Sequence, residues 1–151
     1  MSAFDVAGAR QAAEVGELEL WVHRYLLGPG ANPEFSVGLN REQRFWRGPM
    51  KVQLSLLRRT CGPAPEMRFR ESAEVWDRRV RELADHASDP ETLPPLIVEY
   101  ASGGFLVNDG NHRYAALELD GAIDCWVILW YGDADELEHH ARRDFDRLGV
   151  A

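Results

Sequence analysis

The chain has 151 residues, 45% of them hydrophobic and 10% aromatic, which is enough for one domain with a buried core and too few for two. Its formal net charge of −8 argues against a general nucleic-acid-binding surface, so DNA is not an expected partner. No apolar run approaches the roughly 20 residues of a membrane span, and the N-terminus has no signal-peptide pattern. The two cysteines lie 64 positions apart and fit neither a zinc site nor a disulfide framework. These features predict a cytoplasmic protein with free thiols and no membrane association.

The first third of the chain is predicted to be mainly helical. A broad apolar face over residues 10–27 predicts one long helix, which Gly28-Pro29-Gly30 would end. Residues 31–40 are predicted to form a loop. Residues 41–47 are predicted to form a short helix rich in arginine and aromatic side chains, stopped by Gly48-Pro49.

The remainder of the chain predicts an alternation of strands and helices. Short runs bounded by turn residues predict strands at 52–56, 95–100, 104–108 and 124–130, the middle two joined in a hairpin at Ser102-Gly103. Apolar residues at a spacing of three to four predict helices at 72–87, 110–120 and 133–148, the last opened by a capping box. This order predicts a single α+β domain.

Positive charge is concentrated in one window of the sequence. Residues 41–81 hold eleven basic and five acidic residues, which gives a local net charge of +6. A basic segment inside an acidic protein indicates a local anion site. The alternative is a set of solvated helix faces, because 16 of the 17 basic residues are arginine; the sequence leaves both open.

The segment Asp109-Gly-Asn-His-Arg113 runs from a predicted strand into a predicted helix. A helix start presents unpaired backbone N–H groups and the positive end of the helix dipole, which together suit phosphate. Arg113 opposes that dipole, so a bound anion would account for its position. Asp109 could orient Mg²⁺ or a substrate hydroxyl, or it could cap the helix. Gly110 is expected to be required by the backbone. His112 is expected to contact phosphate, with a structural role in the first turn as the alternative.

Four features follow one another along residues 50–131: Pro94-Pro95-Leu96-Ile97-Val98, the hairpin after it, Asp109-Gly-Asn-His-Arg-Tyr-Ala-Ala116, and the predicted strand at 124–130. In these features the segment resembles the ParB/sulfiredoxin superfamily. The resemblance implies an α+β fold in which a small mixed sheet packs with helices. The implied organisation is a ParB/sulfiredoxin-like core at 50–131, an extra helical segment at 1–49 and a C-terminal helix at 132–151.

The resemblance also implies a nucleotide site. In this superfamily the turn holds nucleotide phosphates, so ATP or another nucleoside triphosphate, with Mg²⁺, is the expected cofactor. The residues implied in binding it are Asp109, Gly110, Asn111, His112 and Arg113. Sulfiredoxin carries a catalytic cysteine where this chain has Asn111, so sulfinic-acid reductase activity is not expected. ParB proteins continue into a DNA-binding region with no counterpart here, so a partition clamp is not expected either.

The remaining interpretation is a nucleotide-dependent phosphotransferase or NTPase acting on a small molecule, similar to the free-serine kinases. In those kinases a glutamate after the first strand accepts the proton of the substrate hydroxyl. The corresponding stretch here predicts Glu66 or Glu71 as the base, with Arg68 and Arg70 as substrate-binding cations. The alternative is that Glu66, Arg68 and Arg70 belong to a solvated, charged edge strand. The alternative is a non-catalytic, nucleotide-sensing regulator whose N-terminal helices bind a protein partner.

Two adjacent histidines, His139 and His140, fall on the last predicted helix. Neighbouring helical positions point to different faces, which is poor geometry for a metal site, so both are predicted to be solvated.

Overall fold

The structure is a computed structural model that describes residues 3–85 and 89–149. Its helices are α1 (Val6–Glu14), α2 (Leu18–Leu27), α3 (Pro33–Leu39), α4 (Ala73–Ala84), α5 (Asn111–Leu119) and α6 (Ala134–Gly149), with short 3-10 helices at η1 (Leu54–Leu56) and η2 (Pro90–Thr92). Its strands are β1 (Phe45–Gln53), β2 (Leu57–Arg59), β3 (Cys61–Gly62), β4 (Phe69–Arg70), β5 (Leu96–Ala101), β6 (Gly104–Asp109) and β7 (Asp124–Tyr131).

Five of the strands form a mixed sheet in the order β1-β7-β5-β6-β2. The β5–β6 hairpin and the β1–β7 pair are antiparallel, whereas β5 runs parallel to β7 and β2 runs parallel to β6. β3 and β4 form a separate two-stranded parallel sheet. The predicted α+β class with a small mixed sheet is therefore confirmed.

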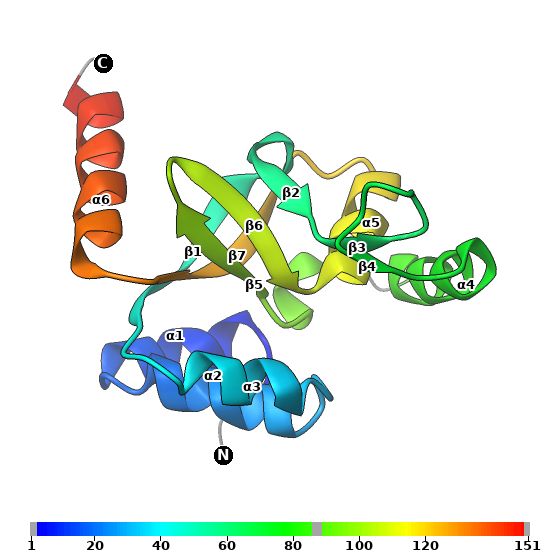
Figure 1. Ribbon diagram of the computed structural model, residues 1–151, viewed down its shortest axis with the longest axis horizontal. Coiled ribbons are helices and arrows are strands. Elements are labelled where there is room, and N and C mark those ends of the chain that lie inside the picture. The colour runs from blue at the N-terminus through cyan, green and yellow to red at the C-terminus, as the bar shows by residue number, and fades with distance from the viewer. Residues whose placement is uncertain (1–2, 86–88, 150–151) are drawn as a thin grey trace.

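Residues 6–39 form three helices, where one helix over 10–27 and a loop over 31–40 were predicted. The helix expected over 10–27 is broken at Gly16, whose φ of +76° lies in the left-handed region that interrupts a helix. The predicted loop at 31–40 contains α3, which has proline in its first turn. Figure 1 shows α1, α2 and α3 grouped below the sheet.

The predicted helix at 41–47 is wrong, because this segment enters the edge strand β1. Phe45 pairs with Tyr131 and Trp46 with Trp130 on the apolar strand β7, and this long-range pairing outweighs local helical spacing. Gly48-Pro49 was predicted to end a helix, but it lies inside β1, where the pairing with β7 shifts register between Arg47 and Met50. An edge strand tolerates such a shift. The predicted division between residues 49 and 50 therefore falls inside a strand.

The elements with strong local signals lie close to their predicted positions. The hairpin, α5, β7 and α6 are confirmed, and Ser72 caps α4 by accepting a bond from the Val75 amide at 3.3 Å. The predicted end of α4 at residue 87 lies outside the described residues. The predicted strand at 52–56 is wrong beyond Gln53, where η1 begins.

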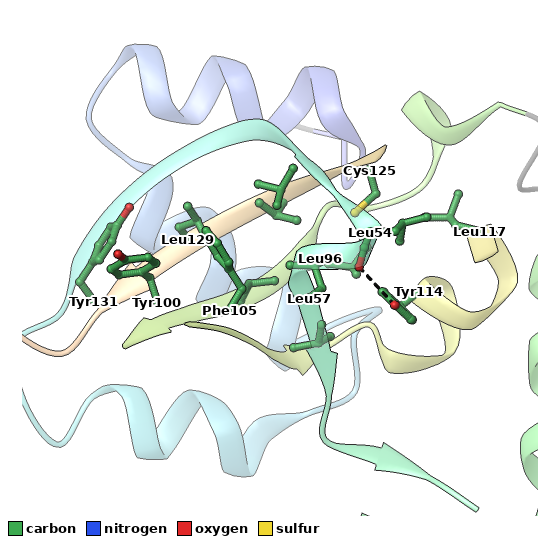
Figure 2. Packing of buried hydrophobic residues seen from close by; sticks show 14 residues of the cluster. Leu54, Leu57, Leu96, Tyr100, Phe105, Tyr114, Leu117, Cys125, Leu129 and Tyr131 are labelled. Atoms are coloured by element: carbon green, nitrogen blue, oxygen red, sulfur yellow. Dashed lines mark hydrogen bonds between the residues drawn. The ribbon is translucent and has the colours of Figure 1, made fainter. Parts of the chain in front are cut away.

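The five-stranded sheet separates two apolar clusters. Ile97, Ile128 and Trp130 on one face pack against α1, α2 and α3. The other face carries the larger cluster, in which the Tyr114 hydroxyl of α5 donates to the Leu54 carbonyl at 3.2 Å (Figure 2). A third cluster joins α4 to α5 through Trp76, Val80, Ala115 and Ala116. The sheet and α4 thus hold α5 from both sides.

The prediction that both His139 and His140 are solvated is wrong for His140, which is 4% exposed. Its ring stacks on Tyr100 at 4.6 Å between centroids, and its Nδ1 lies 2.6 Å from the Tyr131 hydroxyl. His139 Nδ1 lies 2.7 Å from the Tyr100 hydroxyl. The histidines dock α6 on the sheet, a contact between distant segments that helical spacing alone does not reveal.

Both cysteines are free thiols, as predicted. Burial raises the pKa of Cys125 to about 12. Burial also raises the pKa of Cys61, a half-buried thiol. Among the described residues no helix is both long and apolar enough to cross a bilayer.

Alkylation is expected to separate the two thiols. A pKa near 12 in place of 9 lowers the thiolate fraction of Cys125 at pH 8 by about a thousandfold. Iodoacetamide should therefore modify Cys61 first in the native protein and reach Cys125 only after unfolding in urea. Peptide mass spectrometry over a time course checks this order, and equal native rates at the two sites would contradict it.

Candidate functional site

Helix α5 begins at a glycine in the left-handed conformation. Gly110 has a φ of +101°, and a Cβ at this position would lie 2.8 Å from Nη2 of Arg113, so the requirement for glycine predicted from the sequence is met. Gly110 is also the N-cap residue, and no side chain among the described residues caps the helix. The first-turn N–H groups of residues 111–113 therefore have no side-chain acceptor, and they lie at the positive end of the helix dipole.

Asp109 and Arg113 form an internal ion pair at 3.2 Å, with side chains 10% and 11% exposed. Arg113 also donates to the Tyr25 hydroxyl at 2.9 Å and to the Pro95 carbonyl at 3.3 Å. Asp109 accepts a further bond from Nδ2 of Asn32 at 3.2 Å. The guanidinium is thus engaged by protein groups, and the predicted phosphate contact of Arg113 would require some of these bonds to break. Asp109 does not cap the helix, because Gly110 occupies the N-cap position.

Asn111 is buried and fully engaged within the protein. Its Oδ1 accepts from the backbone N–H groups of Thr60 and Cys61, at 2.8 and 3.1 Å. Its Nδ2 donates to the Thr60 hydroxyl at 3.3 Å and to the Val107 carbonyl at 3.2 Å. An amide supplies both acceptor and donors, so Asn111 ties the β2–β3 segment to the start of α5. Its side chain is a structural clamp here, and its backbone N–H is the part left for a ligand.

His112 and Glu71 form a close pair beside the start of α5. Nε2 of His112 lies 2.7 Å from Oε1 of Glu71, and the side chains are 19% and 22% exposed. Trp76 supports the imidazole, with ring centroids 4.6 Å apart. In a neutral ring whose Nε2 donates to Glu71, Nδ1 carries the free lone pair. A carboxylate that orients an imidazole in this way forms an acid–base dyad.

Two arginines add positive potential to the same region. The Arg59 guanidinium lies over the Trp76 ring, 5.0 Å from its centroid. Burial is the largest influence on the pKa of Cys61 and raises it, Glu71 raises it further, and the charges of Arg59 and Arg79 lower it. Both arginines therefore act electrostatically on the segment that Asn111 holds against α5.

The other residues predicted for the site lie on or near β4. Glu66 is an exposed turn residue, and among the described residues it forms no hydrogen bond or ion pair with α5. Arg68 lies over the exposed Phe69 ring, 5.4 Å from its centroid, and Arg70 donates from Nε to the Pro63 carbonyl at 3.3 Å. Of the two glutamates considered as the base, the structure brings Glu71 to the start of α5. Substrate binding by Arg68 and Arg70 stays a prediction.

Sequence reasoning missed several residues that shape this region. Tyr25 lies 88 positions before Arg113, and Thr60 lies 51 positions before Asn111. Trp76 contacts the imidazole of His112, and no local pattern in the sequence indicates this contact. Arg59 and Arg79 lie in the basic window, and no sequence pattern distinguishes them from its other arginines.

No protein-family model matches the chain, and a search of curated proteins found no match. The structure is similar to the crystal structure of sulfiredoxin from Arabidopsis thaliana, with a TM-score of 0.43 and 28% sequence identity. The similarity covers 62% of this chain and 98% of that one. The likeness is to a protein of the superfamily that the sequence resembles. The chemistry of the site rests on the contacts of this chain's own residues.

Proposed function

We propose that this protein binds a nucleotide by its phosphates at the N-terminus of α5 and transfers phosphate to a small hydroxylated molecule or to water. The observation that carries the proposal is the start of α5 itself. It begins at the left-handed Gly110 without a side-chain cap and places three backbone N–H groups beside the His112–Glu71 dyad. Donors of this kind, at the positive end of a helix dipole, form an anion site.

The residues present fit a phosphate-bearing ligand. The backbone N–H groups of residues 111–113 would donate to phosphate oxygens, and Arg59 and Arg79 supply positive potential nearby. Mg²⁺ is proposed to accompany the phosphates, because magnesium is commonly held by phosphates and water with few protein ligands. The proposed setting is the cytoplasm, where triphosphates are available and thiols remain reduced.

The His112–Glu71 dyad is proposed to act as the general base. Glu71 accepts the hydrogen bond from Nε2 and leaves Nδ1 as the proton acceptor for a hydroxyl or water nucleophile. The nucleotide supplies the phosphoryl group. The chain's own contribution is orientation, removal of a proton and stabilisation of negative charge.

Glu71→Gln is expected to lower turnover about 100-fold or more while nucleotide affinity changes little, because a general base contributes to rate and not to phosphate binding. Glu66→Gln is the matched comparison, since Glu66 is an exposed turn residue on the same segment. Phosphate release and transfer to a pool of hydroxylated metabolites, followed by ³¹P NMR, measure turnover. Loss of activity only in Glu66→Gln would assign the base to the turn and contradict the dyad.

A thermal-shift screen of ATP, ADP, CTP and GTP, with and without Mg²⁺, tests binding directly. A ligand that binds only the folded state raises the melting temperature. No shift with any of the four nucleotides, supported by calorimetry, would contradict the proposed function.

A nucleotide-sensing regulator is the second candidate, and a specific contact favours it. Tyr25 of α2 and Asn32 after α2 bond to the Asp109–Arg113 pair at the start of α5. The N-terminal helices are thereby linked to the proposed site. Nucleotide binding without turnover on any substrate would favour this regulator over the phosphotransferase.

A further inference from the structure

A buried polar network joins the N-terminal helices to the turn that starts α5. The Tyr25 hydroxyl accepts from Nη1 of Arg113 at 2.9 Å, and Asn32 donates to Asp109 at 3.2 Å. Tyr25 is 3% exposed, and burial raises the pKa of its hydroxyl, with the charge of Arg113 acting in the opposite direction. The hydroxyl therefore remains neutral at physiological pH.

The guanidinium of Arg113 packs directly against the turn. The tight space at Gly110, where a Cβ would lie 2.8 Å from Nη2, shows how closely the two groups approach. The same Nη2 donates to Asp109, which precedes Gly110, and to the Pro95 carbonyl. The position of the guanidinium thus constrains Asp109 and Gly110, the two residues that lead into α5. Those residues determine where the first N–H groups of α5 point.

One donor nitrogen of Arg113 in this network lacks a hydrogen-bond acceptor. Nε of Arg113 is buried and has no hydrogen-bond partner. Loss of the Tyr25 hydroxyl would leave two of the three guanidinium nitrogens, Nε and Nη1, without a hydrogen-bond acceptor on a buried cation. Such a group is costly to leave unpaired, so the guanidinium and the turn would shift to regain acceptors.

We propose that Tyr25 and Asn32 are positioning residues for the start of α5, so that docking of the N-terminal helices and ligand binding at α5 are energetically coupled. This inference rests on the proposed function for its ligand. It adds that α2 and the segment after it take part in the site without contacting the ligand. Because coupling is reciprocal, ligand at α5 should also tighten the packing of α2.

The test compares Tyr25→Phe with Tyr100→Phe. Each substitution removes one buried tyrosine hydroxyl that accepts from an arginine, since Tyr100 accepts from Nη1 of Arg143 at 3.1 Å in the contact with α6. Isothermal titration with ATP and Mg²⁺ is expected to give about 5- to 50-fold weaker binding for Tyr25→Phe and less than about 2-fold for Tyr100→Phe. Urea unfolding of both variants shows whether they lose comparable stability.

Hydrogen exchange supplies a second measurement, and its comparison of the two variants needs no ligand. Tyr25→Phe is expected to accelerate exchange at the backbone amides of residues 111–114, whereas Tyr100→Phe is not. In the wild-type protein, ATP with Mg²⁺ is expected to slow exchange in α2. Unchanged affinity in Tyr25→Phe, or equal weakening in both variants, would overturn the inference. If no nucleotide binds the wild type, the proposed function fails, while exchange at 111–114 still decides whether Tyr25 positions the turn.

Discussion

Replacement of Arg113 by alanine is expected to lower the free energy of unfolding by about 3–5 kcal/mol. The substitution leaves the carboxylate of Asp109, whose side chain is 10% exposed, without its arginine partner. Among the described residues, its remaining side-chain hydrogen bond is the one from Asn32. It also removes the donor to the Tyr25 hydroxyl and to the Pro95 carbonyl. Urea denaturation followed by circular dichroism measures the change, with the denaturant slope checked for constancy.

Arg142→Ala is the matched control for this loss. Arg142 pairs with Glu138 at 3.0 Å, but the side chains are 71% and 64% exposed, so its removal should cost less than about 1 kcal/mol. A loss below about 1 kcal/mol in Arg113→Ala would show that the internal pair does not hold the turn. Asp109→Asn combined with Arg113→Ala should recover part of the loss, because the uncompensated carboxylate is then gone.

This result also bears on the phosphate role predicted for Arg113. The residue type and its position in the first turn suggested a ligand contact, and the structure shows protein partners for the same guanidinium. Weaker nucleotide binding in Arg113→Ala would follow from either role. Stability must therefore be measured on the same variant. Tyr25→Phe keeps the Arg113 cation, so it helps to separate a phosphate contact of Arg113 from its structural role in the turn.

Replacement of Asn111 by alanine is expected to lower the free energy of unfolding by about 2–4 kcal/mol, because two backbone amides lose their acceptor. The affected N–H groups are those of Thr60 and Cys61, and the Thr60 hydroxyl also loses a donor. Hydrogen exchange at residues 60 and 61 should accelerate along with the loss of stability. Both changes can be followed in one denaturant series.

Asn111→Asp separates the acceptor function from the donor function. Aspartate keeps an acceptor for the amides of Thr60 and Cys61 but lacks the donors to the Thr60 hydroxyl and Val107. It also places a carboxylate at a site that is 6% exposed, so a loss comparable to that of alanine is expected at neutral pH. Wild-type stability in either variant would contradict the clamp assigned to Asn111.

Much of the fold could be predicted where the pattern along the chain was local. The hairpin and β7 have short apolar runs bounded by turn residues, and α5 has apolar residues at helical spacing. The positions of all three agree with the structure. The start of β1 could not be predicted, because it depends on pairing with β7, some 80 residues away. Local spacing over 41–47 favoured a helix that this pairing overrides.

The site was predictable in its central turn and not in its surroundings. The Asp109-to-Arg113 segment is at the start of a helix, as expected, with glycine where the backbone needs it. Which of Glu66 and Glu71 lies near the turn depends on how the segment at β4 packs beside α5. No local pattern in the sequence indicates that packing. Partners such as Tyr25 and Thr60 come from other layers of the fold, and only packing brings them to the turn.

The most direct test of the account is a titration of the ¹⁵N-labelled protein with ATP and Mg²⁺, observed through backbone amide resonances. If phosphate binds the start of α5, the amides of Asn111, His112 and Arg113 should show the largest saturating shifts, with the imidazole of His112 responding alongside them. Shifts confined to other regions, or no shift at millimolar nucleotide, would contradict a phosphate site at this helix.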